Sequence, residues 1–249
     1  MANPFKPVYD SYRTDTQLDF PCMVDIELTN CCNLKCKMCP TGNGSAKRKR
    51  GYMSGNVFRV LLKELERHKT PVRFVRWGEP TLHPNLYDWI SECKEAGLLT
   101  HMNTNGALLD IEEVLDCGLD SIKFSIHEDV SELTRELYKK KPRPYMTLTG
   151  YEGSTKGCAG DEITIGRIKD LTKPPKAYKS CSEVLAKLSI NWDGTISACC
   201  SDYDNLMLAG DIKNNTLEEI WNGRKMRYYR RMLKNTRHAE LPLCKNCDL

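Results

Sequence analysis

The sequence predicts an α/β protein: an open, partial (β/α) barrel of about six parallel strands with a small C-terminal metal-cluster domain. Short apolar runs alternate with amphipathic segments over residues 23–175, which is typical of parallel βαβ units. A hairpin signal and a terminal Cys-x-x-Cys lie within residues 176–249. About six strands and four helices are too few to close an eight-stranded barrel, so the barrel is expected to be open.

Composition narrows the classes of protein further. The chain has 249 residues, a formal net charge of +4 and 13 cysteines. This charge is too mild to indicate nucleic-acid binding. The N-terminus has no apolar signal segment, and no run approaches the roughly 20 apolar residues of a membrane span. We therefore expect a cytoplasmic protein without membrane contact, whose thiols stay reduced and favour metal clusters over disulfides.

Residues 1–22 are polar and predict an extended N-terminal arm before a first strand at 23–28. A flexible, solvated basic loop is expected over 41–50, because it combines glycines with a run of four cationic residues. Further strands are predicted at 72–77, 98–103, 119–126, 145–149 and 161–168. The intervening helices begin at residues suited to helix N-termini: Ser54, Pro84, Asp110 and Asp129.

The pattern of secondary-structure signals in the sequence changes from Cys181 onward. Two alternating runs flank Asp193-Gly194, a strong hairpin signal. Thr216 and Glu219 form a capping box that predicts one helical segment running on through Arg231. The prolines at 174–175 indicate a linker, so the predicted divisions are 1–22, 23–175 and 176–249.

The first indication of a metal-cluster site is a group of three closely spaced cysteines directly after the first strand: Cys32, Cys36 and Cys39. Three thiolates can hold three irons of a 4Fe-4S cluster, which leaves the fourth iron open to a small molecule with an amine and a carboxylate. The same thiols could instead bind zinc, although zinc sites usually pair two ligands with two more further along.

This spacing resembles the signature of the radical S-adenosylmethionine (SAM) superfamily. The resemblance implies that SAM caps the open iron, that an electron from the cluster cleaves it, and that the resulting 5′-deoxyadenosyl radical abstracts hydrogen from a substrate. Trp77-Gly78-Glu79-Pro80 is similar to the family's glycine-glutamate-proline turn, which holds the amino group of SAM, with Trp77 in place of a usual glycine.

Further residues resemble the family's SAM contacts at strand ends. They are Thr104 and Asn105 after the third strand, Ser125 at the end of the fourth, and Met38, which the resemblance places near adenine. Parallel strands place ligands at their carboxyl ends, where Thr104, Asn105 and Ser125 fall. Ordinary strand-end capping is the alternative for Thr104 and Ser125.

A second set of cysteines, Cys181, Cys199, Cys244 and Cys247, could saturate another 4Fe-4S cluster or one zinc ion. Cys200 is an alternative ligand to Cys199. The arrangement resembles the SPASM and twitch extensions of radical SAM enzymes, and the small number of cysteines favours the single-cluster twitch form. A fully ligated auxiliary cluster would move electrons, which implies a net oxidation.

The sequence therefore predicts a radical SAM oxidoreductase that acts on a small polar alcohol such as a sugar or cyclitol. Flavodoxin or ferredoxin is the expected electron donor. Arg167 and His127 could polarise the substrate hydroxyl or accept its proton. Peptide maturation is the alternative within the family. From another class, an iron-sulfur or zinc protein could bind nucleic acid or a partner through the basic segment at 224–231.

Overall fold

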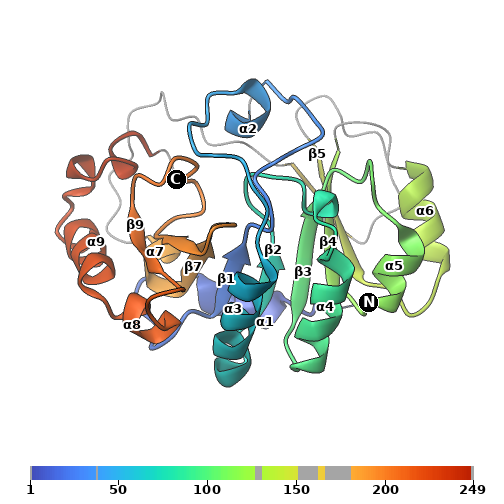
Figure 1. Cartoon of the computed structure of the whole chain (residues 1–249), viewed down its shortest axis with the longest axis horizontal. Helices are drawn as coiled ribbons and strands as arrows, with labels where there is room; N and C mark the ends of the chain where they lie inside the picture. The colour runs from blue at the N-terminus through green and yellow to red at the C-terminus, as the bar shows by residue number, and fades with distance from the viewer. Residues whose placement is uncertain (1, 38, 127–130, 151–161, 166–180, 248–249) are drawn as a thin grey trace.

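The computed structural model describes residues 2–37, 39–126, 131–150, 162–165 and 181–247. One sheet of nine described strands has the order β6-β5-β4-β3-β2-β1-β7-β8-β9 (Figure 1). Its first six strands are parallel neighbours: β1 (Met23–Ile26), β2 (Val72–Phe74), β3 (Thr100–Thr104), β4 (Ser121–Ile126), β5 (Tyr145–Gly150) and β6 (Glu162–Ile165). The predicted open α/β architecture is confirmed.

The C-terminal strands extend this same sheet. Strand β7 (Lys187–Ile190) pairs in parallel with β1, and β8 (Thr195–Ser197) and β9 (Leu208–Asp211) follow as antiparallel neighbours. The expected β7–β8 hairpin turns at Gly194, whose φ of +87° suits a glycine. The pairing of β7 with β1 was not anticipated, because nothing local in either strand specifies its partner.

Four helices cover one face of the sheet: α3 (Gly55–His68), α4 (Leu86–Glu95), α5 (Ile111–Asp116) and α6 (Ser131–Lys139). The side chains of Ser54 and Asp110 cap α3 and α5 as predicted, by accepting hydrogen bonds from backbone N–H groups of the first turn. Beneath these helices lies a continuous apolar core with Ile26, Phe58 and Phe74 at its centre.

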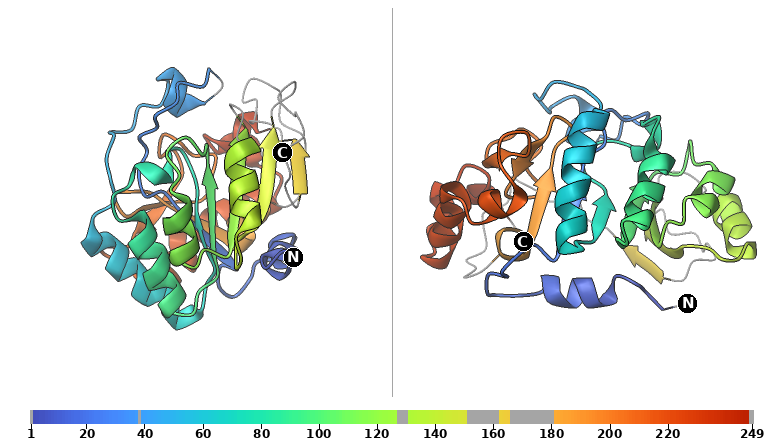
Figure 2. Two further views of the ribbon diagram at one scale, coloured as in Figure 1. Left: turned by 90° about the vertical axis from the view of Figure 1, so that its right-hand side faces the viewer. Right: turned by 60° about the horizontal axis from the view of Figure 1, so that its bottom comes forward.

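The N-terminal arm is not extended throughout, so that prediction is wrong for α1 (Lys6–Tyr12). This helix lies across the opposite face of the sheet from α3 and α4 (Figure 2). Phe5 and Val8 are buried on one side of it, and the Phe5 ring meets the His101 ring edge-on at 5.5 Å. Apolar residues at helical spacing and Pro7 in the first turn were the missed signals.

The C-terminal part contains α7 (Ser182–Ala186), α8 (Leu217–Trp221) and α9 (Arg224–Lys234), and α2 (Pro40–Asn43) follows the first cysteine motif. Short 3₁₀ turns occupy Pro80–Leu82, His238–Glu240 and Cys244–Asn246. The capping box of Thr216 and Glu219 is present. However, the single helix predicted through Arg231 is two helices, because the chain leaves helical geometry at Gly223, the extended N-cap residue that precedes α9.

A buried network of charges joins the barrel strands to the C-terminal part. Asp25 on β1 accepts hydrogen bonds from Arg73 at 2.7 Å and forms an ion pair with Lys187 at 2.8 Å. Lys187 also pairs with Glu183, whose carboxylate accepts a hydrogen bond from the Tyr12 hydroxyl. Burial raises the pKa of Asp25, but the adjacent charges of Arg73 and Lys187 more than offset it and hold the pKa well below its usual range.

Across the described ranges, no helix combines the length and apolarity that crossing a membrane requires.

We predict that Asp25→Asn lowers the free energy of unfolding by about 3–5 kcal/mol, since it removes the counter-charge of Arg73 and one of the two counter-charges of buried Lys187. Because the folded-state pKa is depressed, the stabilisation is present above pH ~4 and is lost as pH falls below that value. Urea unfolding at several pH values measures both effects. Asp10→Asn, which breaks an exposed pair with Lys6, should cost about 1 kcal/mol or less; equal losses in the two variants would contradict the prediction.

Candidate active site

A cavity of about 240 Å³ opens at the carboxyl ends of β2, β3 and β4. It brings together most of the residues predicted for the first cluster and for SAM. The lining residues are Cys32, Leu34, Cys36, Cys39, Val75, Arg76, Trp77, Gly78, Glu79, Asn103, Thr104, Asn105 and Ser125. The carboxyl edge of a parallel sheet is the usual place for a ligand, because loops from neighbouring strands converge there.

The three cysteines lie on the loop between β1 and α2. Burial raises the pKa of Cys32, and the nearby thiols of Cys39 and Cys36 add to this effect. The loop folds tightly against α2, since a Cβ on Gly42 would lie 2.5 Å from the Cys36 nitrogen. The twelve cysteines in the described ranges form no disulfide. Three thiols that line one cavity fit a 4Fe-4S cluster whose fourth iron faces that cavity.

Glu79 fixes the turn after β2 to the end of β3. Its buried carboxylate accepts hydrogen bonds from the Thr104 hydroxyl at 2.7 Å and the Asn105 backbone N–H at 2.8 Å, and also from Thr81. Asn105 in turn donates to Asn33 of the cysteine loop at 2.8 Å. These contacts fix the turn after β2, the end of β3 and the cysteine loop relative to one another.

Gly78 is required by a close approach of two backbones. A Cβ there would lie 2.0 Å from the Thr29 carbonyl oxygen and 2.7 Å from that of Cys31. The preceding backbone is unusual at Arg76, where φ is +128°, a conformation that favours glycine and costs a larger residue about 1–3 kcal/mol. The turn has Trp77 where a glycine is usual, but the strained backbone conformation is at Arg76, one residue earlier. Trp77 itself donates a hydrogen bond to the Cys200 carbonyl oxygen at 3.0 Å.

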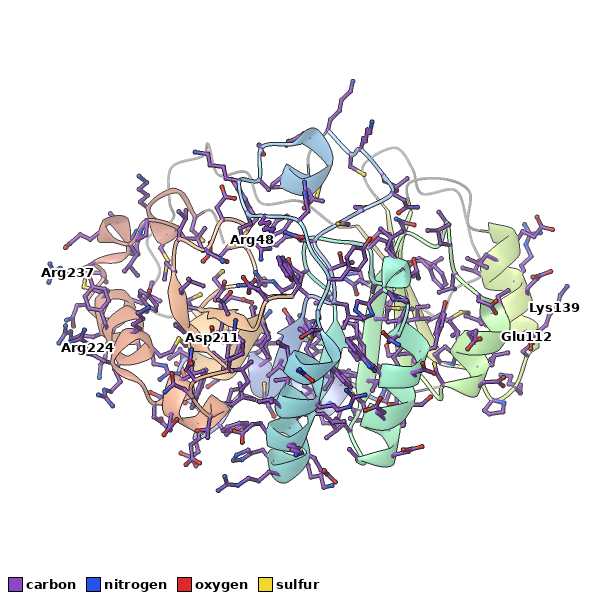
Figure 3. The ribbon with its side chains drawn as sticks, in the orientation of Figure 1. Arg48, Glu112, Lys139, Asp211, Arg224 and Arg237 are labelled. Carbon is purple, nitrogen blue, oxygen red and sulfur yellow. The ribbon has the colours of Figure 1, made fainter. Side chains whose placement is uncertain are left out.

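The basic segment at 41–50 contributes to the interior, so the prediction of a solvated loop is wrong for Arg48. This side chain points inward between α2 and the sheet (Figure 3) and is 8% exposed. Its guanidinium donates to both carboxylate oxygens of Glu27, at 2.8 and 2.5 Å. Sequence reasoning missed Arg48, because a run of cations on a loop is usually solvated and only a tertiary partner distinguishes one member. It also missed Arg76, whose partner at Asp202 is distant in sequence.

The second set of cysteines lies where the C-terminal elements meet. Cys181 precedes α7, Cys199 follows β8, Cys244 begins the last 3₁₀ turn, and Cys247 follows that turn. Burial raises the pKa of Cys181 to about 11, with Glu183 and the Cys247 thiol adding to the rise. Cys181 likewise contributes to the raised pKa of Cys199, after the adjacent Cys200 thiol and burial. Cys181 is thus close enough to both Cys199 and Cys247 for their thiols to interact.

The positions of Cys199 and Cys200 are both compatible with a role as cluster ligand. Ligand atoms of Glu183, Cys199 and Cys200 all lie within 4.8 Å of one another. The charges of Lys187 and Asp25 also affect the pKa of Cys200, whereas the Cys181 thiol affects the pKa of Cys199. Three residues predicted for the site, Met38, His127 and Arg167, lie outside the described residues, so their roles stay predictions.

Comparison with known proteins assigns both parts of the chain. The Radical SAM superfamily model matches residues 26–152, and the SPASM model, an iron-sulfur cluster-binding domain, matches residues 181–248. A dehydrogenase of Niallia circulans, the S-adenosyl-L-methionine-dependent 2-deoxy-scyllo-inosamine dehydrogenase, is 24% identical over 240 residues. That match covers 91% of this chain and 92% of the relative.

Solved structures share the fold. BtrN in complex with AdoMet and 2-DOIA superposes with a TM-score of 0.74 at 21% identity, over 94% of both chains. Streptococcus suis SuiB bound to precursor peptide SuiA gives a TM-score of 0.56 at 14% identity, over 91% of this chain and 69% of that one. Membership implies SAM and a 4Fe-4S cluster as cofactors, with auxiliary iron-sulfur binding in the SPASM region. The chain belongs to the radical SAM superfamily and is a radical SAM enzyme with a C-terminal SPASM-type domain.

Proposed function

We propose that this enzyme oxidises a secondary alcohol of a small polar substrate, such as a sugar or aminocyclitol. The observation that carries the proposal is a sequence match to a dehydrogenase that covers 91% of this chain and 92% of the relative. When bound, the cluster at Cys32, Cys36 and Cys39 supplies the electron that cleaves SAM, and an auxiliary 4Fe-4S cluster supplies an acceptor for the electron that the substrate gives up.

The protein's own groups would orient SAM and substrate in the cavity. The turn at Gly78 and Glu79 and the polar side chains of Thr104, Asn105 and Ser125 are proposed to hold SAM. Cys181, Cys199, Cys244 and Cys247 are proposed to hold the auxiliary cluster, with Cys200 as the alternative to Cys199. The substrate hydroxyl must also lose a proton, and we propose Arg167 or His127 for that transfer.

Peptide maturation is the second candidate, and one observation favours it. The fold is shared with SuiB bound to its precursor peptide. Sequence matches to maturases are partial, however: a Mycobacterium ulcerans mycofactocin maturase is 30% identical over 95 residues, which is 25% of its length. The small-molecule proposal rests on a match that covers 91% of this chain and is therefore preferred.

The test uses 2-deoxy-scyllo-inosamine carrying deuterium at each ring carbinol carbon. Reduced anaerobically with dithionite and given SAM, the reconstituted enzyme should release 5′-deoxyadenosine with deuterium in its methyl group, in equal amount to a ketone product. SAM cleavage without transfer from this or other labelled cyclitols and sugars, but with transfer from a peptide, would favour the maturase. Salt-sensitive RNA binding without any SAM cleavage would overturn both.

We further propose that an acidic flavodoxin or ferredoxin delivers the electron by docking on α9. The exposed residues Arg224, Lys225 and Arg227 lie with Arg231 and Tyr228 around a surface hollow of about 600 Å³. Arg224 projects outward from the edge of the molecule formed by α9 (Figure 3). A face with one sign of charge attracts an oppositely charged partner and raises its association rate.

Replacing Arg224, Lys225 and Arg227 together by glutamine should raise the flavodoxin concentration needed for half-maximal SAM cleavage by about tenfold at low salt. Cleavage driven by dithionite should be unchanged, because a small reductant needs no docking face. The matched control replaces the exposed Arg59, Lys63 and Arg67 of α3. If both triple variants raised the required flavodoxin concentration equally, docking on α9 would be contradicted, because only the net charge of the protein would matter.

A further inference from the structure

Arg230 is a buried cation in the C-terminal part of the chain. It lies on α9 and is 8% exposed. Burial lowers the pKa of its guanidinium to about 10, and within the described residues no neighbouring carboxylate offsets that change. Arg73 differs, because the charge of Asp25 more than offsets burial and raises the pKa of Arg73. A buried charge without a counter-charge is unfavourable, and Arg230 is such a charge.

Contacts with two other helices fix the position of the Arg230 guanidinium. Its Nε donates to the Val184 carbonyl oxygen of α7 at 2.8 Å, and its Nη1 donates to the Trp221 carbonyl oxygen of α8 at 2.7 Å. The guanidinium carbon also lies 3.9 Å from the centroid of the Trp221 ring, which is a cation–π contact. Neutral carbonyls and a ring hold the guanidinium in place without cancelling its charge.

Arg230 lies next to the second set of cysteines. It lines a cavity of about 450 Å³ together with Cys181. Val184, whose carbonyl accepts the Arg230 hydrogen bond, donates its own backbone N–H to the Cys181 carbonyl oxygen at 3.3 Å. The Cys181 thiol interacts in turn with those of Cys199 and Cys247. The buried cation is therefore beside the proposed ligands of the auxiliary cluster.

The other charges near these cysteines are balanced or solvated. The network of Asp25 and Lys187 contains two anions and two cations. The buried carboxylate of Asp202 accepts hydrogen bonds from two backbone N–H groups and does not shift the pKa of Arg230. Asp15 lines the same cavity as Arg230 but is exposed, so water and salt screen its charge.

An iron-sulfur cluster supplies the kind of charge that Arg230 lacks. A 4Fe-4S cluster held by four thiolates is an anion in both redox states, and its reduction adds one more negative charge. A fixed buried cation nearby stabilises the reduced state more than the oxidised state, since the attraction grows with the charge of the cluster. Such a cation therefore raises the reduction potential, which depends on the charges and polarity around the cluster.

We propose that Arg230 is the counter-charge of the auxiliary cluster and raises its reduction potential. Its role in turnover rests on the proposed function. In that oxidation, the substrate carbon loses a hydrogen atom to the 5′-deoxyadenosyl radical. The substrate then gives one electron to the auxiliary cluster and its hydroxyl gives one proton to a base, which leaves a ketone. A higher potential favours this electron transfer. Arg230 acts on the cluster through space and contacts neither SAM nor substrate.

A redox titration followed by electron paramagnetic resonance tests the proposal on the full-length, anaerobically reconstituted protein. Cys32, Cys36 and Cys39 are changed to alanine in every sample, so that the signal comes from the auxiliary cluster. At a fixed applied potential, Arg230→Gln should raise the ratio of oxidised to reduced cluster by about tenfold or more, which is a fall of about 59 mV in midpoint potential. Arg230→Lys keeps the charge and should change that ratio by less than about threefold.

Lys234→Gln is the matched control, because Lys234 also lies on α9 and lines the same cavity but is exposed. It should change the ratio by less than about twofold, since the charge of Lys234 is screened. Arg230→Met is a second charge-free variant, to be used if Arg230→Gln does not hold the cluster.

Two results would overturn the proposal: an unchanged ratio in the charge-free variant, or a shift of equal size in Arg230→Lys or Lys234→Gln. The titration contains no substrate, so it is independent of the reaction. Failure of labelled cyclitols and sugars to react would overturn the proposed function and leave the counter-charge role of Arg230 standing.

Discussion

The parallel pairing of β1 with both β2 and β7 is the constraint on which the rest of the structure depends. β1 leads directly into the loop with Cys32, and β7 leads through the hairpin to Cys199. Because both strands belong to one sheet, the two sets of cysteines have a fixed spatial relation. The buried ion network of Asp25, Arg73 and Lys187 lies across this junction and penalises any separation of the strands.

The candidate site is pre-organised by polar contacts that do not involve a ligand. Glu79 joins the turn after β2 to the end of β3, and Asn105 joins that end to the cysteine loop. Two residues of the cavity wall also contact the C-terminal part: Trp77 donates to the Cys200 carbonyl oxygen and Arg76 to that of Asp202. The residues that line the cavity all belong to the radical SAM domain, and these two contacts fix part of its wall to the SPASM-type domain.

Local signals in the sequence were reliable where a short-range interaction decides the structure. The caps at Ser54 and Asp110 and the box at Thr216 depend on residues within one helical turn, and all three form as predicted. Convergence of the strand-end residues could also be predicted, since parallel strands share an edge. The partner of β7, the burial of Arg48 and the strain at Arg76 depend on residues distant in sequence, and no local pattern encodes them.

Two separate iron-sulfur clusters in one chain underlie the proposed chemistry, and their number can be measured as iron and acid-labile sulfide per chain. After anaerobic reconstitution, the native protein should contain about eight irons, and changing Cys32, Cys36 and Cys39 to alanine should leave about four. Changing Cys181, Cys199, Cys244 and Cys247 should also leave about four, whereas Cys93→Ala, which alters a thiol buried in the core, should retain all eight. Zinc in place of iron, or no loss of iron from the first variant, would contradict the account.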